Sequence, residues 1–208
     1  MSSKILTGVE QYYSQKVSEY GNNSLGVDWN SKESQYLRFE QLSKVITSKE
    51  KFSVLDYGCG YGEYVNYLKI SFAKDLFKYT GYDVSKRMID AGKVLFENNA
   101  DTYFTQQQPE VKFDYTIASG LFNVKLDLAT NEEWLNYIIN TLNTLNNLSE
   151  KGFAFNALTK YSEKEFMKDY LYYADPLFLF NYCKENFSRN VALLHDYELY
   201  EFTLIVRK

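Results

Sequence analysis

The sequence is poor in cysteine, proline and histidine, and each shortage excludes a class of protein. Among 208 residues there are two cysteines, two prolines and one histidine. Cys59 and Cys183 cannot form the disulfide framework of a small secreted domain, and no Cys/His cluster has the spacing of metal ligands. We therefore expect no metal. Without a Pro-rich or Gly/Ser-rich linker, residues 1–208 are expected to form a single domain.

Long apolar runs and an excess of positive charge are also missing. No run approaches the ~20 apolar residues of a membrane-spanning helix, and residues 1–6 lack the apolar core of a signal peptide. Lys and Arg together number 23 against 27 Asp and Glu, and both signs are scattered along the chain. A basic surface for nucleic-acid phosphates is therefore not expected. We expect a cytoplasmic protein that binds neither nucleic acid nor a membrane.

What the chain does contain is a glycine-rich turn between an apolar segment and a helical pattern. The turn reads DYGCGYG over residues 56–62, after Val54 and Leu55 and before Tyr64, Val65 and Leu68. Glycine permits positive φ and lets a ligand approach the backbone, while the first N–H groups of a helix can face polar or anionic groups. The pattern predicts a strand, a tight turn and a helix that bind a nucleotide-like ligand.

The residues around the glycines distinguish between two such ligands. A dinucleotide-binding turn would have a third glycine where this chain has Glu63, and an acid at Asp56 is foreign to it. The pattern D-x-G-x-G-x-G resembles the first motif of class I S-adenosylmethionine-dependent methyltransferases. In that family the loop, here Gly58, Cys59 and Gly60, lies along the aminoacyl arm of the cofactor, and the acid helps to hold its ammonium, directly or through water.

A second acidic position supports the same resemblance. Residues 79–83 are predicted to form the next strand, which ends at Asp83, 21 residues past Gly62, and Ser85 is a suitable helix N-cap. The resemblance assigns Asp83, with Val84 beside it, to the cofactor, because an acid at this position accepts hydrogen bonds from ribose hydroxyls. NAD-binding proteins share this feature. The alternative is an ordinary tight turn with Asp83 as a helix-flanking acid.

The resemblance also implies a fold. It predicts an α/β, Rossmann-like sheet of seven strands in the order 3-2-1-4-5-7-6, with helices on both faces and only the last strand antiparallel. Residues 191–194 and 199–206 resemble the terminal hairpin of this family. A helix is expected from Ser31 to about Thr47, another over residues 131–148 as plain core, and a third starting near Pro176.

Further cofactor contacts are implied by the resemblance and carry open alternatives. Arg38 is assigned to the cofactor carboxylate, or is a solvated surface residue. Family members place a polar side chain, usually Asp, against the adenine after the third strand; here only glutamines follow residues 102–105, and Gln106 is assigned. Ser119 and Asn123 follow the fourth strand and are expected near the methyl group or the acceptor, or they stabilise the loop.

The remaining assignments concern the acceptor side. Residues 1–30, with Tyr20, resemble the segment that closes over the cofactor in many small-molecule methyltransferases; the alternative is a helical arm that only stabilises the domain. The aromatic-rich insert 159–175 is a candidate substrate cap, or plain packing. His195 is expected at the mouth of the site as the base, or is structural, and Tyr197 is assigned to the acceptor.

Together these features predict methyl transfer from S-adenosylmethionine, with S-adenosylhomocysteine as product. The expected acceptor atom is an oxygen, with nitrogen as second choice, on a small polar molecule such as a sugar or phosphate-type group of a surface-glycan precursor. That acceptor follows from a diffuse resemblance to bacterial methyltransferases of surface polysaccharides. Two alternatives stay open: a nicotinamide-dependent oxidoreductase, and a protein that binds S-adenosylmethionine without catalysis.

Overall fold

A computed structural model of the chain describes residues 2–20, 31–73 and 76–208. Within these residues one seven-stranded sheet has the order β3-β2-β1-β4-β5-β7-β6. All neighbours are parallel except β7, which is antiparallel to both β5 and β6. The predicted sheet is confirmed. Its strands are β1 (Phe52–Tyr57), β2 (Phe77–Tyr82), β3 (Thr102–Thr105), β4 (Phe113–Ala118), β5 (Ser149–Leu158), β6 (Asn190–Leu194) and β7 (Glu201–Arg207).

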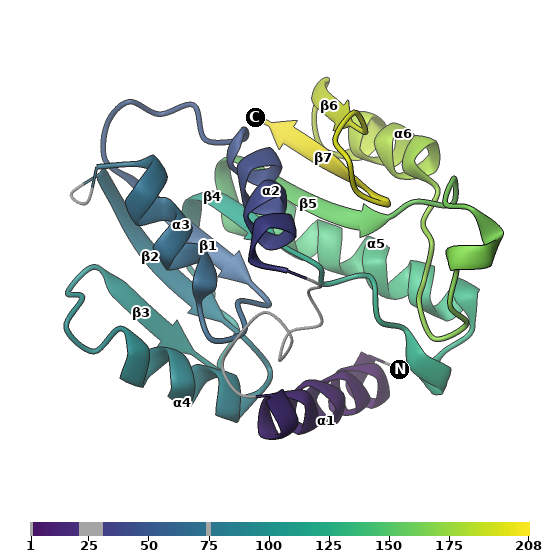
Figure 1. The fold of residues 1–208 in the computed structure, drawn as a ribbon. Helices are drawn as coiled ribbons and strands as arrows, with labels where there is room; N and C mark the ends of the chain where they lie inside the picture. Colours follow the sequence, from purple (N-terminus) through teal and green to yellow (C-terminus); the bar gives the residue numbers. More distant parts are fainter. Residues whose placement is uncertain (1, 21–30, 74–75) are drawn as a thin grey trace.

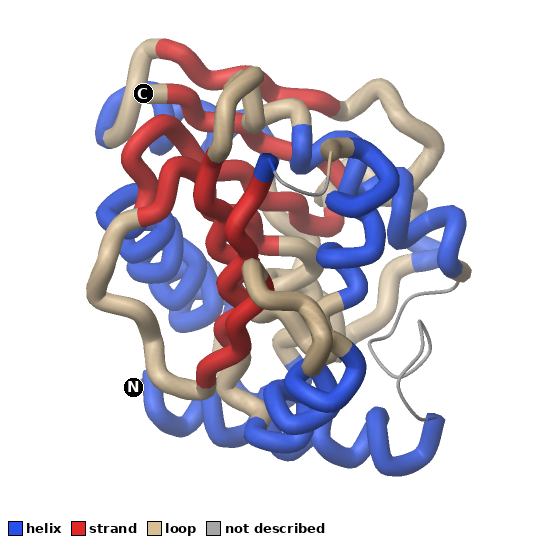
Figure 2. The backbone as a smooth tube through the Cα atoms, turned by 90° about the vertical axis from the view of Figure 1, so that its left-hand side faces the viewer, coloured by secondary structure: helices blue, strands red, loops and turns tan. Residues whose placement is uncertain are grey.

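Helices cover both faces of the sheet (Figure 1). Helices α2, α3 and α4 pack on one face and α5 and α6 on the other, and Figure 2 shows the twisted strands between the two helical layers. No described helix has an apolar stretch long enough to cross a bilayer. The helices are α1 (Ser2–Tyr20), α2 (Lys32–Ser43), α3 (Glu63–Ser71), α4 (Lys86–Leu95), α5 (Asn131–Leu148) and α6 (Pro176–Asn186), with 3-10 turns η3 (Leu126–Leu128) and η4 (Lys164–Phe166).

Side-chain caps fix where the helices begin. The Ser85 hydroxyl accepts the Met88 N–H at the start of α4, and Asp175 accepts two N–H groups at the start of α6, where Pro176 is the first helical residue. Ser31 caps α2 as predicted, but this helix ends at Ser43 rather than near Thr47. After Ser43 the backbone hydrogen bonds change to the i→i−3 type of a 3-10 helix, and Val45 in this segment is buried in the core.

Two apolar layers form because strand side chains alternate between the faces. On β5, Phe153 and Phe155 belong to the cluster around α5 and α6, while Ala154 belongs to the cluster around α2, α3 and α4. Trp134 is fully buried in the first cluster, and its indole N–H donates to the Phe122 carbonyl at 2.9 Å. The predicted core role of residues 131–148 is confirmed.

Helix α1 lies along the carboxyl edge of the parallel strands (Figure 1). Ile5 and Val9 are buried in the cluster around α5, and Gly8 lies against Leu128 of η3. A Cβ at Gly8 would be 2.5 Å from the Leu128 side chain, so glycine allows the close approach of the two elements. Part of the predicted N-terminal arm is therefore packed on the domain; residues 21–30 lie outside the described residues.

Candidate active site

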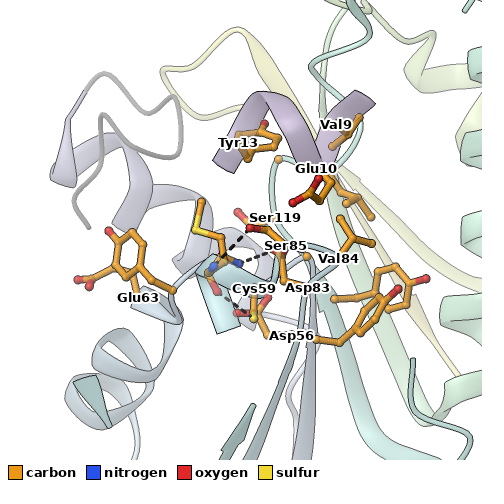
Figure 3. A pocket seen from close by; sticks show the side chains of 18 of the residues that line it. Val9, Glu10, Tyr13, Asp56, Cys59, Glu63, Asp83, Val84, Ser85 and Ser119 are labelled. Atoms are coloured by element: carbon orange, nitrogen blue, oxygen red, sulfur yellow. Dashed lines mark hydrogen bonds between the residues drawn. The ribbon is translucent and has the colours of Figure 1, made fainter. Parts of the chain in front are cut away.

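A pocket opens at the carboxyl edge of the sheet where β1, β2 and β4 end (Figure 3). The chain leaves β1 with β2 on one side and β4 on the other, so the strand order reverses direction at β1. Such a switch point leaves a crevice, because the connections after neighbouring strands turn away from each other. The lining comes from α1, α2, the glycine-rich turn, the β2–α4 connection, the end of β4 and α5.

The glycine-rich turn is hydrogen-bonded to the end of β2 and to Asp83, which follows it. Gly58, Gly60 and Gly62 have φ values of 83°, 54° and 90°, which favour glycine. The Gly58 N–H donates to the Tyr82 carbonyl at 2.8 Å, and the Gly60 N–H donates to the Asp83 carboxylate at 2.9 Å. Both N–H groups are therefore already bonded within the protein. The turn provides a close approach to its backbone, while these two N–H groups bind the protein itself.

Close packing beneath the glycine-rich turn explains why positions 62 and 81 are occupied by glycine. A Cβ at Gly62 would lie 2.5 Å from the Phe104 ring, and one at Gly81 would lie 2.8 Å from the sulfur of Cys59. Burial raises the pKa of the Cys59 thiol well above its usual value. The thiol is therefore a neutral, compact group that fills space beside β2, and Cys59 is also one of the residues that line the pocket.

Asp83 has a structural task as well as a place in the pocket. One carboxylate oxygen accepts the Gly60 N–H at 2.9 Å and the other accepts the Ser85 N–H at 2.8 Å (Figure 3). Burial raises the pKa of Asp83, and these two backbone donors act in the opposite direction. Each carboxylate oxygen has two lone pairs, so Asp83 can still accept hydrogen bonds from a ligand.

Asp56 lies deeper and has one polar partner. Its side chain is buried, and the Tyr79 hydroxyl donates to it at 2.8 Å. The pKa of Asp56 is raised to about 7, chiefly by burial and also by the charge of Asp83, while the hydrogen bond from Tyr79 acts in the opposite direction. A cation bound beside Asp56 would favour the ionised carboxylate. Binding of a positive charge beside Asp56 would therefore release its proton.

The opposite wall follows β4. Ser119, Gly120 and Leu121 line the pocket here, and Gly120 has a φ of 70°. The Ser119 hydroxyl oxygen is buried and has no hydrogen-bond partner within the described part of the chain. A buried hydroxyl without a partner is unfavourable by a few kcal/mol, so this oxygen is suited to bind a ligand or an ordered water.

Helix α1 forms the roof of the pocket. Leu6, Val9, Glu10 and Tyr13 line it, and Figure 3 shows Glu10 projecting from α1 toward Ser119 and Asp83. The same helix buries Ile5 in the core. One helix therefore both stabilises the domain and covers the pocket, so the two interpretations of this segment describe two faces of the same element.

The pocket lining is strongly acidic. Four carboxylates contribute to it, those of Glu10, Asp56, Glu63 and Asp83, and the described lining residues include no Lys, Arg or His. Negative charge in a partly closed pocket attracts cations and repels anions, and screening by salt is weaker there than on an open surface. The electrostatics favour a ligand with net positive charge or none.

Comparison with known proteins supplies the family. Residues 29–155 match the family model of a methyltransferase domain. The Mycobacterium tuberculosis protein Rv1506c, whose own name proposes a methyltransferase, is 46% identical over 167 residues, which cover 79% of this chain and 98% of that protein. The chain is a class I S-adenosylmethionine-dependent methyltransferase. The resemblance first visible in residues 56–62 and at Asp83 is confirmed.

Solved structures agree on the fold of this methyltransferase. The Synechocystis magnesium protoporphyrin IX methyltransferase, solved with S-adenosylhomocysteine, has a TM-score of 0.61 at 17% identity and covers 98% of this chain and 95% of its own. The N-methyltransferase NodS of Bradyrhizobium japonicum, solved with the same compound, has a TM-score of 0.63 at 12% identity, with coverage of 94% and 97%. Their different acceptors leave the acceptor of this chain open.

Three predicted contacts lie outside the lining of the methyltransferase pocket. Arg38 is buried, contrary to the solvated alternative, and its Nε donates to Glu201 at 2.8 Å. Asn123 is also buried, donates to Glu201 at 3.1 Å and accepts the Leu158 N–H at 3.0 Å, so its role in the structure is to stabilise the loop. Gln106 is exposed and donates to the backbone carbonyl of Val84, a lining residue, at 2.8 Å.

The structure does not bring His195 to the pocket. His195 follows β6, the edge strand, which lies three strand spacings from β4, or roughly 14 Å. Its exposed ring lies against Tyr161 and Phe202, with centroids 6.1 and 6.2 Å away. The hydroxyl of Tyr197 is 2.9 Å from that of Thr203. The sixth strand does end at the cofactor edge, but the lateral distance across the sheet separates His195 from the pocket.

The insert 159–175 is likewise away from the pocket lining. Thr159 pairs with Ala174 and Leu171 with Val124 in isolated bridges, which tie the insert to the end of β5 and to the β4–α5 connection. Aromatic side chains of the insert contact the hairpin loop that contains His195. The structure therefore supports packing for this segment. Tyr20 ends α1, and its side chain is outside what the structure describes.

Several lining residues were not predicted from sequence. Glu10, Gln35 and Tyr137 come from three helices, and each belongs to an ordinary helical pattern without a motif. Only the docking of α1, α2 and α5 around the glycine-rich turn brings them together. Within the described residues no group of three or more His, Cys, Asp or Glu side chains could hold a metal ion.

Proposed function

We propose that this methyltransferase transfers the methyl group of S-adenosylmethionine to a neutral hydroxyl of a small polar molecule, such as a sugar. The observation that carries the proposal is the acidic lining without a Lys, Arg or His among its described residues. S-adenosylmethionine has a sulfonium and an ammonium against one carboxylate, so it suits this charge. A phosphate-type acceptor would add negative charge beside four carboxylates, which disfavours its binding.

The residues of the pocket fit the parts of this cofactor. Asp56 is assigned to the ammonium, Asp83 to the ribose hydroxyls and Val84 to the adenine, with Gln106 at the rim through its bond to Val84. The turn through Gly58, Cys59 and Gly60 would lie along the aminoacyl arm. Ser119, whose buried hydroxyl has no partner among the described residues, faces the same space. The sulfonium supplies an already activated methyl group.

The protein then has two tasks, to align the acceptor and to exclude water. Helix α1 serves the second as the roof of the pocket. A carboxylate on this helix, Glu10, projects into the pocket, whereas His195 does not line it. We assign to Glu10 the proton of the acceptor hydroxyl, a step that matters where the hydroxyl has a high pKa.

The first test of the proposal is binding measured by calorimetry with S-adenosylmethionine, S-adenosylhomocysteine and NADH. We expect both sulfur compounds to bind, and Asp83→Asn to weaken them at least tenfold, since one oxygen that accepts hydrogen bonds becomes a donor. Asp114→Asn is the matched control, because Asp114 accepts the Ser53 N–H at the opposite edge of the sheet. Binding of NADH alone would favour the oxidoreductase alternative.

Turnover is tested next with neutral sugars and with their phosphate esters, by release of S-adenosylhomocysteine. We expect neutral acceptors to be methylated faster, and Glu10→Gln to slow turnover with little change in cofactor affinity. Faster methylation of the phosphate esters would contradict the proposed acceptor class. Cofactor binding without turnover on any acceptor would favour the non-catalytic alternative.

A further inference from the structure

A buried polar network lies behind the pocket and joins four elements of the fold. Its centre is the carboxylate of Glu201, the first residue of β7. Arg38 of α2 donates to it through Nε at 2.8 Å, Asn123 donates at 3.1 Å, and Asn156 of β5 donates through its amide nitrogen. We call these four residues the Glu201 network. None of them lines the pocket.

Burial makes this network costly to disturb. The residues Arg38, Asn123, Asn156 and Glu201 are 8%, 6%, 0% and 1% exposed. A buried carboxylate requires several kcal/mol of compensation, which here comes from one guanidinium and two amide donors. Arg38, Asn123 and Asn156 all donate hydrogen bonds to the carboxylate, so a side chain that itself carries a donor would face at least one of these donors unfavourably.

One arm of the network holds the wall of the pocket that follows β4. The Asn156 side-chain oxygen accepts the Gly120 N–H at 2.8 Å, so one amide group binds both Gly120 and Glu201. Gly120 lies between Ser119 and Leu121, and all three line the pocket. Three residues further on, Asn123 binds Glu201 and the Leu158 N–H. The loop 119–123 is therefore held near its start through Asn156 and at its end through Asn123, and both asparagines bind the same carboxylate.

The other arm holds the wall formed by α2. The Arg38 Nη1 group donates to the Ser34 carbonyl at 2.8 Å, within the same helix. The residues that follow Ser34 and Arg38 in sequence are Gln35 and Phe39, and both line the pocket. Glu201 thus binds the α2 wall through Arg38 and the β4 wall through Asn156. One carboxylate therefore connects the two walls.

We propose that Glu201 is a positioning residue for the cofactor pocket, and that it acts through Asn156 and Gly120 on one side and through Arg38 on the other. The inference rests on the proposed placement of the cofactor between these walls. It also gives Arg38 a role different from the predicted contact with the cofactor carboxylate. Changes in the network should therefore alter cofactor affinity although none of its members lines the pocket.

The experiment compares S-adenosylhomocysteine affinity and melting temperature in three variants. Glu201→Gln keeps the shape of the side chain and replaces one acceptor oxygen by a donor. Asn156→Ala leaves the Arg38–Glu201 ion pair in place and removes the support of Gly120, so it keeps the test valid if Glu201→Gln does not fold. Ser149→Ala is the control, because Ser149 is fully buried and hydrogen-bonded to Thr116 at the opposite end of β5.

We expect Glu201→Gln and Asn156→Ala to raise the dissociation constant of S-adenosylhomocysteine at least tenfold, and Ser149→Ala to change it less than twofold at a similar loss of melting temperature. A purely structural network predicts the same affinity in all folded variants, and dissociation constants within twofold of the wild type would overturn the inference. If the wild-type protein itself does not bind S-adenosylhomocysteine, the proposed cofactor placement fails instead.

Discussion

The pKa of Asp56 gives a quantitative prediction about the protein without its cofactor. Burial raises this pKa to about 7, whereas an unfolded Asp has a pKa of about 3.9. Between these values the folded state keeps a proton that the unfolded state has lost, so stability falls as pH rises through this window. Three pKa units correspond to about 4 kcal/mol, or roughly 8–16 °C of melting temperature in a domain of this size.

Cofactor binding should reverse this effect. An ammonium beside Asp56 stabilises the ionised carboxylate, so binding releases the proton that the free protein holds. Below pH 7 the affinity for S-adenosylhomocysteine should therefore rise up to tenfold per pH unit, and near and above pH 7 it should level off. The stabilisation by the ligand should grow over the same range, because it follows the affinity.

The assay is calorimetric titration with S-adenosylhomocysteine at pH 5.5, 6.5 and 7.5, in buffers of different ionisation enthalpy, which reports protons released on binding. The control is Asp56→Asn, which has nearly the same shape and does not titrate. We expect the wild type to release a proton at low pH and the variant to show neither this release nor most of the pH dependence of affinity. Equal pH dependence in the two proteins would refute the reasoning.

Three further substitutions test the fold and the site. Gly62→Ala places a Cβ 2.5 Å from Phe104 at a φ of 90°, and should lower the free energy of unfolding by about 2 kcal/mol or more in urea titrations. His195→Ala should leave methyl transfer within about twofold of the wild type, because the exposed ring does not line the pocket, and a large loss would restore its role as base. Trp134→Ala should cost about 3–5 kcal/mol in unfolding free energy, while Val111→Ala on the surface should cost less than about 0.5 kcal/mol.

The parts of the site that sequence could predict are those that depend on neighbouring residues. The turn over residues 56–62 needs glycines at positive φ wherever this chain folds, and Asp83 follows directly from the end of β2. The starts of α4 and α6 could be predicted in the same way, because Ser85 and Asp175 each cap the helical turn that directly follows. For the same reason the resemblance to a known family was visible at these positions and correctly implied the sheet order.

Roles that depend on distant residues were not predictable in this way. Arg38 and Glu201 are 163 positions apart, and neither belongs to a motif, so their buried pairing could not be inferred. His195 was placed at the correct edge of the sheet by its strand, but its lateral position depends on how many strands separate β6 from β4. Sequence patterns describe strand direction better than distance across a sheet.

The sequence by itself determined the glycine-rich turn and the acids at the ends of β1 and β2, because short-range geometry requires particular residues there, and the family resemblance carried by these residues implied the strand order. Only the tertiary structure decided that α1 covers the pocket and brings Glu10 into its lining. It further decided that the described lining residues include several carboxylates but no Lys, Arg or His. It also decided that Arg38 faces Glu201. The physical reason is that burial and charge pairing depend on which helices dock against which strand ends, and long-range packing of the whole chain sets that docking.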